Sequence, residues 1–314
     1  MSNLILPHPC LEMITRLECC IIQLCMSVLT ITHPLNGLLC LSLGIGLGLL
    51  ITLKYKIGWR FWWVGVFTFI FSQIGHLPFN TVLLNPWMAE TIEQIPQAWQ
   101  IPFTALVLGL SAGLFEEFSR YAVYRWWIKD ARTWSQGLLF GAGHGGFEAI
   151  LIGALSLYTY AQLVALRGAD LSALFPADQV SLVQEQVSMY WTLPWYDSLL
   201  GAVERLFALP LHLASALLVL QAFTRQQFRW VWLAVGLHTL VNTLAVYLAQ
   251  VATVYIAELA IGILAGLEIL IILRLRSTMP AAPAPIENPT TRWPAVQIGP
   301  VPETPETLED TRYQ

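Results

Sequence analysis

The sequence predicts an all-α fold, a polytopic membrane helix bundle with about seven transmembrane helices. Charged residues make up only 11% of the 314 residues and hydrophobic residues make up 56%, whereas a soluble domain carries about 25% charged residues. Apolar runs of about 20 residues, the length that crosses a bilayer, recur along the chain. The 16 Lys and Arg residues are spread too thinly to form the basic patch of a nucleic-acid-binding protein, so no nucleic-acid partner is expected. The expected spans are 36–53, 59–78, 103–127, 134–158, 198–223, 229–249 and 252–273.

The links between these spans alternate in charge. Basic residues occupy the first, third and fifth links and follow the last span. The second link is acidic, the fourth is net acidic because Arg167 is outnumbered by four acidic residues, and the sixth is uncharged. Positively charged loops favour the cytoplasmic side, so we expect the N-terminus outside and the C-terminus in the cytoplasm. The fourth link, 159–197, is long and has aromatic residues near its end, which is typical of a segment that lies along lipid headgroups. The basic residues are Lys54, Lys56, Arg60, Lys129, Arg132, Arg225, Arg229, Arg274 and Arg276.

The two ends of the chain differ from the central region, 36–276, which we expect to form one membrane-embedded domain. Residues 1–35 form an N-terminal extension without an assigned role. Residues 1–33 are a poor match to a signal peptide, because the apolar run 21–31 is short and no small-residue cleavage site follows it. Residues 277–314 are rich in Pro and Glu without an apolar period, and they are predicted to be a disordered, Pro-rich cytoplasmic tail. The five cysteines, at positions 10, 19, 20, 25 and 40, fit no zinc-binding pair and are interpreted as small apolar residues.

Ionisable side chains interrupt four of the spans. Each charged group near the middle of a span costs about 2.5–3.5 kcal/mol on insertion scales, so such groups usually face the protein interior and mark a function. Ion pairing explains part of the set, because Glu116 and Glu117 lie four and three residues before Arg120, and Arg205 can pair with Glu148 of another helix. It does not explain three histidines on three further helices. The polar set is Glu116, Glu117, Arg120, His144, Glu148, Glu204, Arg205, His212, His238 and Asn242.

Counting along the helices places one glutamate and the three histidines near a common depth. At about 1.5 Å per residue, Glu116, His144 and His238 lie about 15 Å from the cytoplasmic ends of their spans, and His212 lies about 20 Å from its end. Small residues at four-residue spacing beside His144 would let another helix approach closely. The sequence therefore predicts one polar site inside the bundle. The small-residue stripe is Gly137, Gly141 and Gly145.

Glutamate and histidine at one depth are the ligand types of catalytic zinc, which keeps one position open for water. A metal-free alternative stays open, in which a desolvated Glu with a His beside it activates water. In either version Asn242 or Arg120 would stabilise the oxyanion, and the reaction would be hydrolysis of an amide inside the membrane. The expected ion is zinc, and the expected ligands are His144, His212, His238 and Glu116.

Three motifs on separate helices resemble a known family. Glu116-Glu117-x-x-Arg120, Phe140-x-x-x-His144 and His238-x-x-x-Asn242 occur in that order, and they resemble the motifs of the CAAX-protease and bacteriocin-processing (CPBP, also called Abi) superfamily of membrane peptidases. The run G-H-G-G-F-E at 143–148, together with Glu204-Arg205 and His212, is similar to the YhfC branch, whose members are described as intramembrane metalloproteases. The resemblance covers about 36–276.

The resemblance implies a peptidase-like domain over 36–276 and a role for each motif. Glu116 would activate water, with Glu117 and Arg120 in support. His144 and His238 would bind metal or water, and Asn242 would assist the oxyanion. The further supporting residues would be Glu148, Glu204, Arg205 and His212.

The favoured hypothesis is an integral membrane endopeptidase of a bacterial plasma membrane, which hydrolyses a peptide bond of a membrane protein or peptide within or near the bilayer. Two alternatives use the same polar core: an ion- or proton-coupled transporter, and a non-catalytic membrane scaffold. Residues 109–113 read G-x-S-x-G, but the strand–turn–helix elbow that a serine nucleophile needs is not expected inside a membrane helix. The lipid bilayer is an expected partner, while the substrate, the cleavage site and the oligomeric state stay open.

Overall fold

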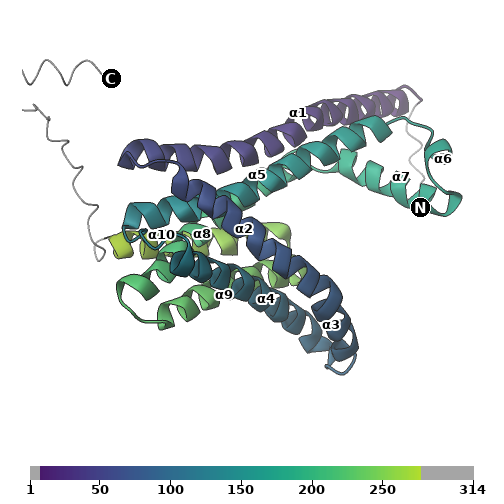
Figure 1. Ribbon diagram of the computed structural model, residues 1–314. Coiled ribbons are helices and arrows are strands. Elements are labelled where there is room, and N and C mark those ends of the chain that lie inside the picture. The colour runs from purple at the N-terminus through teal and green to yellow at the C-terminus, as the bar shows by residue number, and fades with distance from the viewer. Residues whose placement is uncertain (1–7, 277–314) are drawn as a thin grey trace, which may run out of the picture. The chain divides into compact units, whose positions relative to one another are not determined.

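The computed structural model describes residues 8–276, with side chains from Val28 onward, and every regular element in that range is a helix. The long helices pack against one another as a bundle, and α1 and α5 run side by side over much of their length (Figure 1). In chain order the elements are α1 (His8–Tyr55), α2 (Arg60–Pro78), the π-helix η1 (Phe79–Leu84), α3 (Asn85–Ile92), α4 (Gln97–Trp126), α5 (Trp134–Leu166), α6 (Leu171–Leu174), α7 (Ala177–Thr192), the 3₁₀-helix η2 (Asp197–Leu199), α8 (Leu200–Thr224), α9 (Arg229–Val251) and α10 (Val254–Arg276).

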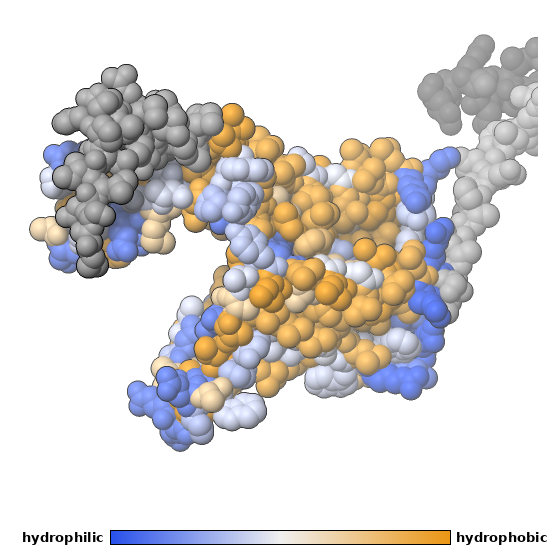
Figure 2. Space-filling model, turned by 180° about the vertical axis from the view of Figure 1, so that it is seen from behind, coloured by the Kyte–Doolittle hydropathy of each residue, from blue (hydrophilic) through white to orange (hydrophobic). Residues whose placement is uncertain are grey.

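Seven helical segments of the described chain are long and apolar enough to cross a membrane, which confirms the predicted all-α membrane fold. Each coincides with one expected span, although several helices continue beyond the apolar run that predicted them. The face of the molecule seen in Figure 2 carries a broad apolar area, with most of the hydrophilic residues towards its margins. Which end of the bundle faces the cytoplasm stays a prediction. The seven segments are Val28–Tyr55, Arg60–Ile92, Gln97–Trp126, Trp134–Leu166, Asp197–Thr224, Arg229–Val251 and Val254–Arg276.

The proposed ends of the membrane domain are only partly within the described residues. Helix α1 is continuous from His8 to Tyr55, so no break in the backbone marks the boundary expected at residue 36. The predicted tail, 277–314, lies outside the described residues. In the long fourth link, α5 continues to Leu166 and the short helix α6 and the helix α7 follow, with Arg167 packed over the ring of Trp191 at 4.6 Å.

Helix α5 lies at the centre of the packing because glycines line two of its faces. It begins with a capping box, in which Thr133 and Gln136 satisfy each other's backbone N–H groups. On one face, a Cβ at Gly141 would lie 2.9 Å from Leu213 Cα and 3.0 Å from Ala216 Cβ of α8. The predicted stripe of Gly137, Gly141 and Gly145 therefore faces α8, and it allows the close approach expected of small residues.

The other glycine-lined face of α5 packs against α1 and α2. A Cβ at Gly65 of α2 would lie 2.7 Å from the backbone nitrogen of His144, and a Cβ at Gly146 would lie 2.6 Å from the carbonyl oxygen of Gly44. The sequence stripe indicated only the face towards α8. Backbone atoms cannot move aside as a flexible side chain can. The contacts on this second face therefore fix the position of His144 against α2.

Helix α4 packs against α9 through the same kind of contact. A Cβ at Gly109 would lie 2.5 Å from the hydroxyl of Thr243, and a Cβ at Gly113 would lie 2.8 Å from the hydroxyl of Thr239. The glycines of the G-x-S-x-G run thus serve helix packing, and the run lies inside α4 rather than on a strand–turn–helix elbow.

Candidate active site

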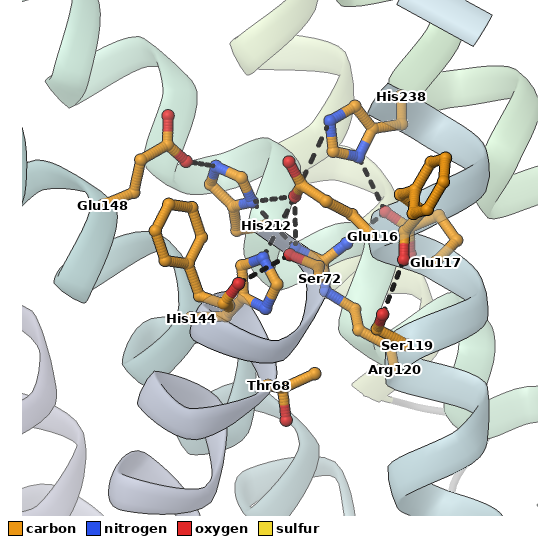
Figure 3. Close-up of polar contacts among 12 residues, drawn as sticks. Thr68, Ser72, Glu116, Glu117, Ser119, Arg120, His144, Glu148, His212 and His238 are labelled. Atoms are coloured by element: carbon orange, nitrogen blue, oxygen red, sulfur yellow. Dashed lines mark hydrogen bonds and ion pairs between the residues drawn. The ribbon is translucent and has the colours of Figure 1, made fainter. Parts of the chain in front are cut away.

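Four helices bring their polar side chains to one place inside the bundle. Figure 3 shows Glu116 of α4 pointing towards the rings of His144 (α5), His212 (α8) and His238 (α9). The Oε2 atom of Glu116 lies 3.0 Å from His144 Nε2, 3.8 Å from His212 Nδ1 and 3.8 Å from His238 Nε2. All four residues are buried, with Glu116 the most exposed at 6%. The convergence expected from helix depth is therefore present in the structure.

Two of the histidines are each oriented by a carboxylate on a different helix. Nε2 of His212 lies 2.7 Å from Glu148 Oε2, and Nδ1 of His238 lies 2.7 Å from Glu117 Oε1. A neutral imidazole that donates from one nitrogen keeps a lone pair on the other, which here faces Glu116. This arrangement, a carboxylate behind a histidine, is the one that fixes the tautomer of metal-binding and catalytic histidines.

Two arginines complete the buried network. Arg120 is fully buried; it pairs with Glu117, donates to Glu116 over 3.3 Å and donates from Nη2 to His212 Nδ1 over 2.9 Å. Arg205 pairs with Glu148, and with Glu204 over 2.5 Å. The ion pairs expected from the sequence are thus present. The network contains four carboxylates and two guanidinium groups, so with neutral imidazoles it carries two excess negative charges.

A small cavity of about 70 Å³ opens beside these residues. Glu116, His212, His238 and Asn242 contribute to its wall, as does Glu204, whose side chain is 42% exposed. A site needs about 10–15 Å³ and several polar partners to hold a water molecule, so this cavity has room for water beside Glu116. Asn242 lies one turn after His238 and is half-buried, and its side chain makes no hydrogen bond with any described residue, which leaves its amide group free for a ligand.

The donor set fits a divalent metal ion. Glu116, His144 and His212 each offer a ligand atom, these atoms lie within 4.8 Å of one another, and all three residues are buried. Two histidines and a glutamate form a known catalytic zinc site, and a dication would balance the two excess negative charges. One contact disfavours a metal ion at this position. The guanidinium group of Arg120 contacts Nδ1 of His212, the nitrogen that His212 would offer to the metal. His238 is not one of these three residues, but its Nε2 lies 3.8 Å from Oε2 of Glu116, which is.

The structure also places near the site several polar residues that the sequence reasoning missed. His76 of α2 lies 3.1 Å from the hydroxyl of Ser111 and 2.9 Å from the amide nitrogen of Asn80, and its Nδ1 is buried without a partner in the described chain. The sequence did contain a signal for His76 and Asn80, because His76-x-x-x-Asn80 has the same spacing as His238-x-x-x-Asn242. Asn80 lies in the π-helix η1, a type of segment that is frequent at functional sites.

Helix α10 adds two acidic residues that the sequence reasoning also missed. Glu268 is 1% exposed and neither carboxylate oxygen has a partner in the described chain; one oxygen of Glu258 is likewise buried and unpaired. Both residues lie within the expected span 252–273, so a plain count of charges in that span finds them. The surroundings of Glu268 could not be predicted from the sequence, because no residue within four positions of it offers a polar partner.

A comparison with protein families and a comparison with individual proteins indicate the same family. The family described as YhfC intramembrane metalloprotease matches residues 39–264. The chain is also 33% identical over 225 residues to the uncharacterized membrane protein YhfC of Bacillus subtilis (strain 168), an alignment that covers 68% of this chain and 82% of the relative. No solved structure gives a significant match. The extent of the family match and of the shared sequence shows that this membrane protein belongs to the YhfC family.

Proposed function

We propose that this protein is an integral membrane endopeptidase that hydrolyses a peptide bond within or near the bilayer, and that it is a member of the CPBP superfamily. The observation that carries the proposal is the buried junction of Glu116 with three histidines beside a cavity that has room for water. The family description, intramembrane metalloprotease, supports the same chemistry. The expected location is a bacterial plasma membrane, and the expected substrate is a membrane protein or a membrane-bound peptide.

In the proposed site, Glu116, His144 and His212 would hold a zinc ion. Zinc in such a site supplies a Lewis acid and makes a bound water easier to deprotonate. His238 lines the cavity while Glu117 holds its Nδ1, so its Nε2 would be free to accept a proton from a water molecule there. Glu117 does not line the cavity and is fully buried, so we assign it to orienting His238 rather than to contacting water.

The remaining residues would act on the substrate carbonyl and on the leaving group. Water oxygen attacks the carbonyl carbon, one water proton passes to His238, and His238 then donates it to the amine that leaves as the C–N bond breaks. Asn242 lies in the same wall and can donate its amide N–H to the oxyanion. In the metal-free version, Glu116 itself takes the proton, because it is the carboxylate at the centre of the three histidines.

The alternatives predict different chemistry. A proton-coupled transporter would need a continuous relay, and the direct side-chain contacts that lead from Glu204 to His238 pass through Arg205 and Arg120, whose guanidinium groups do not give up a proton in proteins. We therefore favour the peptidase hypothesis over the transporter hypothesis. Substrate-dependent proton flux into liposomes would reverse this order, while a scaffold would retain its partners when Glu116 is replaced by Gln.

The test compares the membrane proteome of a strain that carries the wild type with one that carries Glu116→Gln. We expect a membrane-proximal cut that disappears in Glu116→Gln and persists in Glu93→Gln, which removes an exposed carboxylate outside the site. Identical fragments in the wild type and Glu116→Gln strains, with equal amounts of protein, would exclude the peptidase.

Metal content is tested separately on the purified protein. Elemental analysis should find about one zinc per chain, and joint His144→Ala and His212→Ala replacement should remove it. The control, His33→Ala, replaces a buried histidine that stacks on Tyr190 at 3.8 Å outside the site. An active preparation without zinc would leave the metal-free version alone.

A further inference from the structure

A second cavity, of about 390 Å³, lies between α1, α8 and α10. Ten of its eleven lining residues are apolar or glycine, including Gly46, Leu50, Pro210 and Ile269. The exception is Ser42, whose hydroxyl donates to the carbonyl of Leu38 in its own helix over 2.7 Å. The wall therefore presents hydrocarbon and no free hydrogen-bonding side chain.

This cavity continues towards one end of the bundle into a further cavity of about 350 Å³. The two share Leu50, Leu213, Ile269 and Ile272, so they form one groove. At the far end the lining changes to Lys54, Tyr55, Trp134 and Arg276. We call this continuous space, lined by these residues, the α1–α8–α10 groove.

The groove is separate from the active site, although one helix borders both. Leu209, Pro210 and Leu213 of α8 face the groove, whereas Leu211 and His212 face the cavity beside Glu116. The lining residues of the two spaces do not overlap. A ligand in the groove would therefore contact the reverse side of α8 and would not contact Glu116 or any of the three histidines of the active site.

The polar end of the groove is cationic and lacks acidic partners. Lys54 and Arg276 are exposed, and neither makes an ion pair with another described residue. Arg276 packs over the ring of Trp134 at 5.4 Å, and Trp134 in turn contacts Tyr55. Among the described residues at this end, Asp130 is the only acid, and it already pairs with Arg60. The other basic residues at this end are Lys56, Arg125, Lys129, Arg132, Arg225, Arg229 and Arg274.

We propose that the α1–α8–α10 groove binds an anionic phospholipid, with an acyl chain along the apolar wall and the phosphate at Lys54 and Arg276. A hydrocarbon wall that ends in cations matches this class of molecule at both ends. Trp and Tyr rings prefer the headgroup level of a bilayer, where Tyr55 and Trp134 would then lie. Basic residues near an anionic leaflet attract its lipids. The proposal does not depend on whether the protein is a peptidase.

Lipid titration of the full-length protein in detergent, followed by native mass spectrometry, tests both ends of the groove. The probes are phosphatidylglycerol and phosphatidylcholine with identical acyl chains. The headgroup variant is Lys54→Gln with Arg276→Gln, and its control is Lys129→Gln with Arg229→Gln, which removes the same charge at the same end outside the groove. The acyl-chain variant is Gly46→Phe, because a Cβ at Gly46 meets no atom within 4 Å and a side chain there enters the groove. Its control is Gly266→Phe, a glycine with the same open surroundings outside the groove.

We expect the wild type to bind phosphatidylglycerol on the order of tenfold more tightly than phosphatidylcholine, from two cations near the headgroup. The headgroup variant should lose this preference and its control should keep it. Gly46→Phe should reduce binding of both lipids, and Gly266→Phe should not. Equal binding of the two lipids by the wild type would overturn the anionic assignment. Unchanged lipid binding by a folded Gly46→Phe protein would overturn the groove as the site of the acyl chain.

Discussion

Replacement of Gly145 by Ala should disturb the candidate active site through packing alone. Gly145 lies on the face of α5 that contacts α8, and a Cβ there would lie 2.5 Å from Cδ2, 2.8 Å from Cγ and 2.8 Å from Cβ of His212. Carbon atoms pack best at about 3.5–4.0 Å. The Cβ of His212 is fixed to its backbone, so rotation of the ring cannot relieve the clash, and α8 must retreat by about 1 Å.

The size of the effect follows from two opposing terms. Alanine gains about 1 kcal/mol over glycine in a helix, and overpacking a close contact costs about 1–3 kcal/mol. The free energy of unfolding should therefore fall by about 0–2 kcal/mol, a modest loss. The effect on the site is larger, because a 1 Å shift stretches the 2.7 Å contact of His212 with Glu148 beyond hydrogen-bonding distance. Loss of such a supporting contact typically costs 10- to 100-fold in metal affinity.

The assay measures zinc affinity and thermal unfolding of the purified variants in detergent. Gly236→Ala is the control, because a Cβ at Gly236 meets no atom within 4 Å. We expect Gly145→Ala to lose zinc affinity at least tenfold relative to Gly236→Ala, with a small change in unfolding temperature. Equal zinc affinity in the two variants would refute the view that the α5–α8 contact sets the position of His212.

Three further predictions concern single side chains. Glu148→Gln should lower zinc affinity about 10- to 100-fold, measured by competition with a chelating dye, because His212 loses its charged partner; unchanged affinity would contradict that role. Glu268→Leu should raise the thermal midpoint, since removing an unpaired buried carboxyl relieves a cost of about 1–3 kcal/mol, and a lower midpoint would indicate a partner for Glu268. The hydrogen bond from the Arg60 guanidinium holds the pKa of Asp130 below its ordinary value, so this pair stabilises the fold above about pH 4 and the gain is lost as pH falls through the lowered pKa. Asp130→Asn should thus be less stable than the wild type by at most about 1 kcal/mol at neutral pH, because the pair is exposed, and the gap in thermal midpoint should close in acid; a gap independent of pH would exclude the ion pair as its source.

The depth of the site could be predicted from the sequence, whereas the rotation of each helix could not. Rise per residue is the same in every α-helix, so counting from the helix ends was enough to bring Glu116, His144 and His238 to one level. The partners of Arg120 within α4 followed from three- and four-residue spacing. The contact of Glu117 with His238 depends on how α4 and α9 face each other, and no spacing along one helix contains that information.

The residues that the sequence reasoning missed share a physical reason. The significance of His76 and Glu268 comes from surroundings that other helices supply. A carboxyl group flanked only by apolar residues looks like an isolated cost in the sequence, and only packing decides whether it is exposed, paired or buried alone. For Glu268 the structure gives the last of these outcomes within the described chain.

Helix α8 lies between the two proposed ligand sites. It has the largest buried share of the seven spans, and Gly141 and Gly145 leave no free space between it and α5. On its other side, Leu209, Pro210 and Leu213 face the α1–α8–α10 groove. Tight packing transmits displacement rather than absorbing it, and His212 directly precedes Leu213 in the chain. An occupant of the groove that shifts α8 would therefore carry His212 with it, and the same close contacts would pass the shift to α5, which carries His144 and Glu148.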